Sequence, residues 1–195
     1  MTAPTEGRWV MDTSTFTHFC RAGREDLLRR LAPQGVILLP DTVLTEVEAG
    51  RDRGYDIPAI ASFPWVERGI LTLAEEYTQL LIKVDMPSKK SDPPRKHLGE
   101  CAVLACAKHR AMVAVIDDGD ARTQARQREL PYITTMWIVA EAHKTLEDID
   151  CEATEQIYQD LLDTEMKLPA AGAFHPWATR FGMLACTPEP SAEQS

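Results

Sequence analysis

The chain of 195 residues lacks the features of several large protein classes. No apolar run approaches the roughly 18 to 20 residues that cross a bilayer, so we expect no membrane partner. The opening segment MTAPTEGRWVMDTS has no apolar stretch of the kind that a secretory signal contains. The glycine-rich loops that bind dinucleotides or nucleoside triphosphates are also missing. These absences favour a soluble protein that does not use such a loop to bind phosphate.

Cysteine is scarce, with five residues that make an odd number and form no C-x-x-C pair. A disulfide framework or a zinc site normally needs paired spacings. We therefore expect buried thiols in a reducing compartment, and hence a cytoplasmic protein. The five residues are Cys20, Cys101, Cys106, Cys151 and Cys186.

Positive charge is also in short supply, because 21 Lys and Arg face 30 Asp and Glu. Over the whole chain this argues against the basic surface usual in proteins that bind nucleic acid. The excess is uneven, however. Residues 141–195 hold 11 acidic and 3 basic residues, whereas residues 1–140 hold 19 and 18. The larger part of the chain is nearly neutral, so net charge does not exclude an anionic partner.

Short apolar runs alternate with segments of helical periodicity. Continuous apolar runs are typical of buried parallel strands, and we predict strands at 8–12, 36–39, 70–73, 112–116 and 132–134. The predicted helices lie at 41–50, 98–110, 121–130 and 136–146. This alternation predicts a three-layer α/β/α sandwich around a mostly parallel sheet of roughly five strands.

Two segments depart from this alternation. Residues 83–96 contain three prolines and five basic residues, which predicts a surface loop. Residues 151–167 form an acidic helical segment, followed by a stretch of small residues mixed with Pro, Phe and Trp. We therefore expect a domain over 1–148, a helical extension over 149–187 packed on it, and a disordered tail over 188–195.

Acidic residues occupy the positions where chemistry is expected in such a fold. Asp12 ends the first apolar run, and Asp117 and Asp118 end the fourth. Glu46 and Glu100 lie in otherwise apolar helical segments. Because functional groups gather at the carboxyl ends of parallel strands, these five carboxylates are expected to converge.

Each acidic residue also has a simpler interpretation. Asp12 could cap the helix that follows it, and the Asp117-Asp118 turn could cap the next one. Glu46 could be a solvated helix position, and Glu100 could complement the helix dipole. The five together, in this order, are harder to explain in that way.

A cluster of desolvated carboxylates needs a cation, because the negative charges would otherwise repel one another and raise their pKa values. Oxygen ligands favour Mg²⁺ or Mn²⁺ over softer metals. One or two such ions can activate a water and neutralise charge on a phosphodiester. An acidic pocket can in this way cleave an anionic polymer.

Four motifs together resemble those of PIN-domain ribonucleases. They are Asp12 in VMDTSTF, Glu46 in VLTEVEAG, Glu100 in LGECAVLACA, and the run VIDDGDARTQA. The resemblance covers roughly residues 8–148 and is nearest to a bacterial subgroup with Asp-Asp at a strand end followed by Ala-Arg. It implies a three-layer fold, metal-dependent cleavage of RNA and frequent homodimers. Many members of the family are toxins that a cognate antitoxin holds inactive.

The resemblance also implies roles for individual residues. The implied catalytic residues are Asp12, Glu46, Glu100, Asp117 and Asp118. The implied ligands of one or two Mg²⁺ or Mn²⁺ ions are Asp12, Glu100, Asp117 and Asp118, with a cap as the other role of Asp118. Thr13 or Ser14 would hydrogen-bond a metal-bound water. Arg122 would hold a carboxylate, contact phosphate or form a structural ion pair, and Thr134 and Thr135 would line the pocket.

RNA would also require cations outside the acidic pocket. The candidates on the proline-rich loop are Lys89, Lys90, Arg95 and Lys96, although a solvated loop needs no such role. The acidic helix after residue 150 and the tail are additions to the compact toxin pattern. They put an antitoxin in doubt, because the added helix could occupy the groove that a partner would use.

Two alternatives compete with a nuclease. The first is a catalytically inactive PIN-like module that binds RNA or protein, and the full set of acidic residues argues against it. The second is a phosphatase or phosphotransferase that uses Asp12 as its nucleophile. That chemistry usually needs a second acid two residues further on, where this chain has Ser14.

Overall fold

The computed structural model describes residues 7–169 and 173–184. Its centre is a five-stranded sheet in which all neighbouring strands run parallel, in the order β3-β2-β1-β4-β5. The strands are β1 (Trp9–Met11), β2 (Ile37–Pro40), β3 (Val66–Gly69), β4 (Val113–Val115) and β5 (Tyr132–Ile133).

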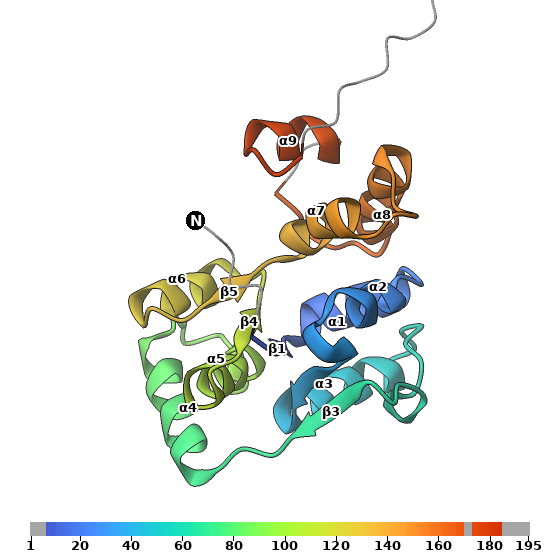
Figure 1. Cartoon of the computed structure of the whole chain (residues 1–195). Helices are drawn as coiled ribbons and strands as arrows, with labels where there is room; N and C mark the ends of the chain where they lie inside the picture. Colours follow the sequence, from blue (N-terminus) through green and yellow to red (C-terminus); the bar gives the residue numbers. More distant parts are fainter. Residues whose placement is uncertain (1–6, 170–172, 185–195) are drawn as a thin grey trace, which may run out of the picture.

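Helices cover both faces of the sheet (Figure 1). On one side lie α4 (Leu73–Asp85), α5 (Leu98–Arg110) and α6 (Gly119–Gln127). On the other lie α1 (Thr13–Arg21), α2 (Glu25–Leu31), α3 (Asp41–Asp52), α7 (Thr135–Thr145) and α8 (Cys151–Asp163), with α9 (Phe174–Arg180) packed on α8. The 3₁₀ turns are η1 (Pro33–Gly35) and η2 (Ile60–Ser62). The predicted α/β/α sandwich is therefore confirmed.

The order of the strands determines where a site can form. The chain adds β2 and β3 on one side of β1, then returns to place β4 and β5 on the other side. The direction of winding thus reverses between β1 and β4, which pair in register from Trp9–Val113 to Met11–Val115. In open parallel sheets a ligand crevice forms at this reversal, at the carboxyl ends of the strands.

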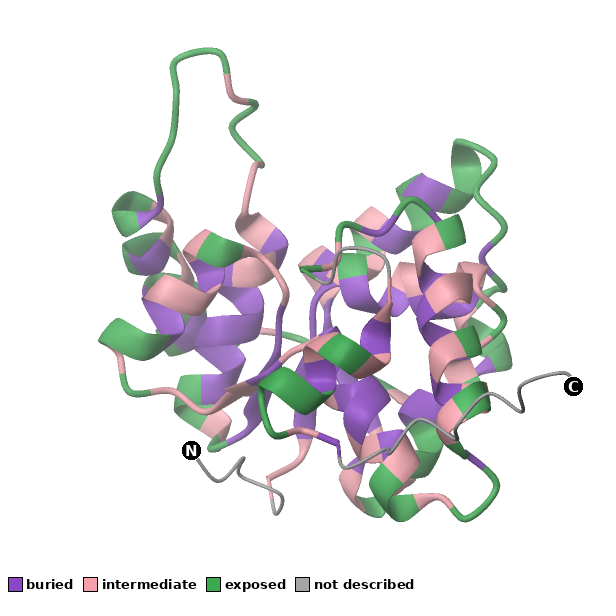
Figure 2. Ribbon diagram, turned by 90° about the horizontal axis from the view of Figure 1, so that it is seen from above, coloured by how far each residue is buried: buried purple, intermediate pink, exposed green. Residues whose placement is uncertain are grey.

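The core explains why these elements form. All residues of β1, β2 and β4 are buried, which is the reason that they read as continuous apolar runs. Seven consecutive residues of α5, from Cys101 to Ala107, are buried as well. Figure 2 shows these buried residues gathered at the centre, between the helix layers. The alanines of α5 are small enough to let this helix lie close against the sheet.

The strand predicted at 70–73 is wrong. The third strand is Val66–Gly69, and its central residues Glu67 and Arg68 are exposed. β3 is an edge strand with a single neighbour, so it does not need the apolar run that a central strand needs. Ile70 and Leu73 are 68% and 85% exposed instead.

The cysteines follow the prediction only in part. Cys20, Cys101 and Cys106 are buried free thiols, as expected. Cys151 is disulfide-bonded, so the expectation of thiols throughout is wrong for this residue. Cys186 and the tail predicted at 188–195 lie outside the described residues.

In the described part of the chain, no helix is both long enough and apolar enough to cross a membrane.

Candidate active site

Asp12 lies at the point where β1 ends and α1 begins. Its backbone N–H donates to the carbonyl of Val115 in β4, at 3.1 Å. Its carboxylate caps α1 by accepting a hydrogen bond from the backbone N–H of Thr15, at 2.8 Å. The side chain is buried, and burial is the main reason that the pKa of Asp12 rises to about 8, with the charges of Asp117 and Glu100 adding to the rise. Asp12 is thus a helix cap and an acidic residue in need of a cation.

Asp117 follows β4 and is held by two threonines. Its Oδ1 accepts the backbone N–H of Thr135 at 3.0 Å, and its Oδ2 accepts the Thr135 hydroxyl at 2.5 Å. The hydroxyl of Thr15 donates to the same Oδ2 at 3.1 Å. Thr15 in α1 and Thr135 in α7 are both fully buried. Asp117 is therefore fixed in place from two different helices.

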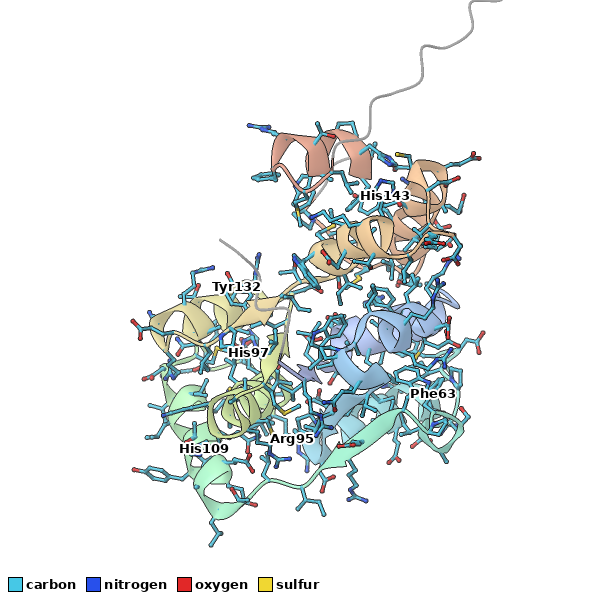
Figure 3. The ribbon with its side chains drawn as sticks, in the orientation of Figure 1. Phe63, Arg95, His97, His109, Tyr132 and His143 are labelled. Atoms are coloured by element: carbon cyan, nitrogen blue, oxygen red, sulfur yellow. The ribbon has the colours of Figure 1, made fainter. Side chains whose placement is uncertain are left out.

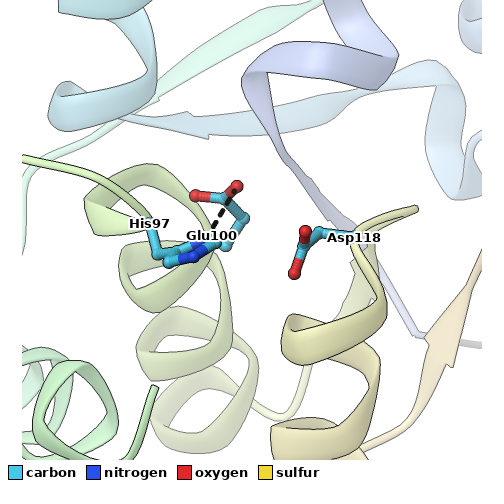
Figure 4. Close-up of side chains that lie close together, drawn as sticks. All are labelled: His97, Glu100 and Asp118. Atoms are coloured by element: carbon cyan, nitrogen blue, oxygen red, sulfur yellow. Dashed lines mark ion pairs between the residues drawn. The ribbon is translucent and has the colours of Figure 1, made fainter. Parts of the chain in front are cut away.

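Glu100 in the first turn of α5 and Asp118, the N-cap residue of α6, lie close together (Figure 4). Asp118 uses Oδ1 to cap α6, accepting the N–H of Ala121 at 2.8 Å. Nδ1 of His97 lies 3.7 Å from Oε1 of Glu100. One ligand atom from each of His97, Glu100 and Asp118 lies within 4.8 Å of the other two, so these three could share a metal ion.

A cavity of about 450 Å³ is lined by Asp12, Glu100, Asp117 and Asp118 together. Five of the predicted site residues line it, and four of them are the set predicted to bind metal: Asp12, Glu100, Asp117 and Asp118. Exposed Ser14 lines it as well. The remaining lining residues are His18, Gly119, Glu165, Met166 and Lys167.

Glu46 is not among the residues that line this cavity. Its carboxylate accepts hydrogen bonds from the hydroxyl of Thr13 and from the backbone N–H of Gly99. Burial raises the pKa of Glu46, and the hydrogen bond from Thr13 opposes the rise. Arg95, whose charge also lowers this pKa, lies near α3 (Figure 3). The charge of Glu100 also raises this pKa, and Glu46 thus connects α3 with Thr13 of α1 and with the start of α5, beside the acidic group.

The supporting residues Thr134 and Arg122 lie outside the cavity lining. Thr134 caps α7 by accepting the N–H of Trp137 at 3.3 Å, while its neighbour Thr135 makes the contacts to Asp117. Nε of Arg122 is buried and has no hydrogen-bond partner among the described residues. Neither Thr134 nor Arg122 is among the residues that line the cavity.

The predicted RNA-binding residues lie on the segment between α4 and α5, which extends away from the body (Figure 2). Lys89, Lys90 and Arg95 are exposed. Lys96 is half-buried and pairs with Asp92 within the same loop, at 3.1 Å. Three of the four cations are thus presented to solvent.

Sequence reasoning missed the contribution of the segment after α8. Glu165, Met166 and Lys167 form one wall of the cavity, and Thr164 lies 2.6 Å from Nδ1 of His18 in α1. Thr15 was missed as well, although its position three residues after a capping aspartate could have suggested a role. Nothing in the local sequence links residues 164–167 to a site that begins at Asp12.

The donor set fits a hard divalent cation. Asp12, Glu100, Asp117 and Asp118, four of the five carboxylates that line the cavity, offer oxygen ligands, which suit Mg²⁺ and Mn²⁺. The raised pKa of Asp12 also favours a bound cation, because burial and the neighbouring carboxylates disfavour a negative charge there unless a positive charge lies beside it. The acidic group could therefore bind a metal.

Fold and site together define an α/β/α protein with an acidic cavity at the carboxyl edge of a parallel sheet. The family model of the PIN domain matches residues 8–171, and the chain belongs to this family. It therefore has a nuclease-type fold, in a family whose members are generally nucleases and usually use divalent metals. No curated protein matches the chain.

Proposed function

We propose that the chain is an endoribonuclease that depends on Mg²⁺ or Mn²⁺ and hydrolyses RNA phosphodiesters. The observation that carries this proposal is the cavity lined by Asp12, Glu100, Asp117 and Asp118. Asp12 follows β1, Glu100 lies in the first turn of α5, and Asp117 and Asp118 follow β4. In the described part of the chain, no ion pair joins any of them to Lys or Arg. Their charge is therefore available to a metal.

One or two ions held by these carboxylates would supply a water of lowered pKa and neutralise charge on the phosphate. The chain's own residues set the geometry. Thr15 and Thr135 orient Asp117, while Glu46 and Thr13 position the start of α5, which carries Glu100. Ser14 is exposed at the cavity and is placed to hydrogen-bond a water or a phosphate oxygen.

Lys167 is the only Lys or Arg among the described residues that line the cavity, and we assign it to the RNA phosphate. Lys89, Lys90 and Arg95 are exposed and are not among the residues that line the cavity, so they would contact the RNA outside the cleaved bond. Such contacts make binding weaker as salt rises. Lys167→Ala should raise KM more than it lowers kcat.

The test is cleavage of a labelled RNA by the wild type with Mg²⁺, with Mn²⁺ and with EDTA. Asp12→Asn and Asp117→Asn are compared under the same conditions. We expect cleavage by the wild type with metal, and a loss of about 100-fold or more in each variant. The proposal fails if the wild type cuts nothing with either metal, or if both variants cut as well as the wild type.

The alternative is an inactive PIN-like module that binds RNA or protein. It needs no metal ligands, so the four converging carboxylates favour the nuclease over it. Binding of the same RNA without cleavage would support the module instead.

The cellular role that we propose is that of a cytoplasmic toxin restrained by an antitoxin, and the Asp-Asp and Ala-Arg motif supports it. A toxin of this kind should arrest growth when it is expressed alone. Co-expression of the product of the adjacent reading frame should restore growth. The Asp12→Asn variant is the control, since it should not arrest growth.

A further inference from the structure

His97 is a buried histidine beside the acidic cavity, and its ring makes no hydrogen bond within the described part of the chain. The side chain is 7% exposed. Nε2 is buried without a partner, and Nδ1 lies 3.7 Å from Oε1 of Glu100, which is too far for a hydrogen bond. A buried polar group without a partner costs free energy, and in a native protein it points to a bound water or ion.

Two carboxylates lie close to this ring. Figure 4 shows the side chains of His97 and Glu100 next to each other, with the carboxylate of Asp118 facing them from the start of α6. Asp118 caps α6 through Oδ1, while its Oδ2 makes no hydrogen bond to a described residue. A ring nitrogen and two carboxylates are thus gathered without hydrogen bonds to one another.

The spacing of these three groups suits a single ion. Nitrogen and oxygen ligands bind divalent ions of this size at about 2.1 Å, so two ligands of one ion are at most about 4.2 Å apart. Nδ1 of His97 and Oε1 of Glu100 meet this limit as they stand. The ligand atom of Asp118 lies within 4.8 Å of the other two, so a small movement of its carboxylate completes the set.

The imidazole distinguishes this position from the rest of the cavity. Asp12 and Asp117 offer oxygen ligands alone, and oxygen ligands suit both Mg²⁺ and Mn²⁺. Mg²⁺ retains water and oxygen ligands, whereas first-row transition metals also accept an imidazole nitrogen. A ligand set of one nitrogen and two carboxylates therefore discriminates against Mg²⁺.

We propose that His97 is a metal ligand that, together with Glu100 and Asp118, makes this position bind Mn²⁺ in preference to Mg²⁺. The inference rests on the metal site of the proposed nuclease, and it decides between the two ions named there. Glu100 and Asp118 line the cavity, whereas His97 is not among the lining residues. The ring can therefore determine which ion is bound without contacting the RNA.

The backbone of His97 indicates which substitution tests this role. His97 is the N-cap residue of α5 and lies in the left-handed region, with φ 62° and ψ 10°. Asn is one of the residues that adopt this region most readily, and it is also favoured at the start of a helix. His97→Asn therefore removes the imidazole and keeps the local backbone.

The first experiment measures metal binding to the full chain without RNA. Free Mn²⁺ is followed by EPR, and Mg²⁺ is measured by competition against it. We expect the wild type to bind Mn²⁺ at least about tenfold more tightly than Mg²⁺. His97→Asn should raise the Kd for Mn²⁺ at least about tenfold, and it should change the Kd for Mg²⁺ less than about threefold, because water can replace the ring on Mg²⁺. Circular dichroism melts check that the variant is folded.

The second experiment detects the ligand directly. Pulsed EPR of bound Mn²⁺ records the coupling to the nitrogen of a coordinated imidazole. At saturating Mn²⁺ we expect this coupling in the wild type and not in His97→Asn. His18→Asn is the matched control, because His18 lines the cavity and its Nδ1 lies 2.6 Å from the hydroxyl of Thr164. This variant should keep the coupling.

A nitrogen coupling that persists in His97→Asn would overturn the proposal, and so would equal affinity of the wild type for Mn²⁺ and Mg²⁺. The nuclease activity is judged separately. RNA cleavage without any nitrogen coupling would remove the role of His97 and leave the nuclease standing. Bound Mn²⁺ that shows the coupling in a protein that cuts no RNA would do the reverse.

Discussion

Thr135 donates both its backbone N–H and its hydroxyl to the carboxylate of Asp117, at 3.0 Å and 2.5 Å. The two contacts lie at the first turn of α7, so this helix positions an acidic residue that follows β4. Thr135→Val keeps the shape of the side chain and removes the hydroxyl. We expect it to lower kcat for RNA cleavage about tenfold, because Asp117 then loses its shortest hydrogen bond.

Thr134→Val is the matched control for that prediction. It removes the cap of α7 and should cost about 1 kcal/mol of stability. It leaves the contacts to Asp117 in place, so its kcat should stay within about twofold of the wild type. A larger loss of kcat in Thr134→Val than in Thr135→Val would contradict this division of roles.

Removal of the metal should be visible without any RNA. A ligand at 100 times its Kd stabilises the folded state by about 2.7 kcal/mol, which for this length of chain is a rise in Tm of about 5 to 10 °C. We expect Mn²⁺ to produce such a rise in the wild type and EDTA to abolish it. Glu100→Gln should lose most of the rise. An equal rise in Glu100→Gln would place the metal elsewhere.

Gly99 has no room for a side chain unless the carboxylate of Glu46 or the helix shifts. A Cβ at this position would lie 2.7 Å from Oε2 of Glu46, which is fixed by Thr13. Gly99→Ala should therefore displace the first turn of α5, and with it Glu100, lowering kcat about tenfold at a cost of about 1 kcal/mol in stability. Kinetics and urea unfolding measure the two effects.

Gly119 is the matched control, because it also lies in the first helical turn beside the cavity. A Cβ there would meet only Arg122, at 4.0 Å. Gly119→Ala should keep the kcat of the wild type. If both alanine variants lose the same activity, the close approach of Glu46 is not the cause.

The ion pair between Glu75 and Arg110 predicts a dependence of stability on pH. The hydrogen bonds from Arg110 are the main reason that the pKa of Glu75 falls to about 2 from an ordinary value of 4.5. Because the folded pKa is the lower one, the stabilisation is complete above about pH 5 and is lost as pH falls toward 2. Glu75→Gln should cost about 2 kcal/mol at pH 7.

The measurement is the free energy of unfolding in urea at pH 7, 5 and 3. The difference between wild type and Glu75→Gln should shrink at the lowest pH. Glu48→Gln, at an exposed position of α3, should cost less than about 0.5 kcal/mol at every pH. A constant difference between wild type and Glu75→Gln across the range would contradict the assigned ion pair.

The sequence predicts the sheet where its strands are buried on both faces. The runs that become β1, β2 and β4 are apolar throughout, because helices cover both sides of them. β3 could not be found in this way, since an edge strand carries exposed Glu67 and Arg68. The apolar residues just after it, Ile70 and Leu73, were mistaken for the strand.

The site was predictable to the extent that it follows strand ends. Asp12 and Asp117 come directly after neighbouring strands, and Glu100 follows from the start of an alanine-rich helix. Thr134 and Thr135 were both predicted at this edge of the sheet, but their chemistry is the same, and only the backbone decides that Thr134 caps α7 and Thr135 contacts Asp117. The contacts of Glu46 with Thr13 and Gly99 depend on how three helices meet, which no local pattern records.

Glu165, Met166 and Lys167 line the cavity but are not among its four proposed metal ligands. These three residues follow α8 and lie far along the chain from the segments that carry those ligands. If the cavity cleaves RNA as proposed, insertions, deletions or substitutions after Asp163 would change which RNA structures reach it while Asp12, Glu100, Asp117 and Asp118 stay where they are. Substrate range would then evolve, or be engineered, at a segment more than 40 residues beyond the last of those carboxylates.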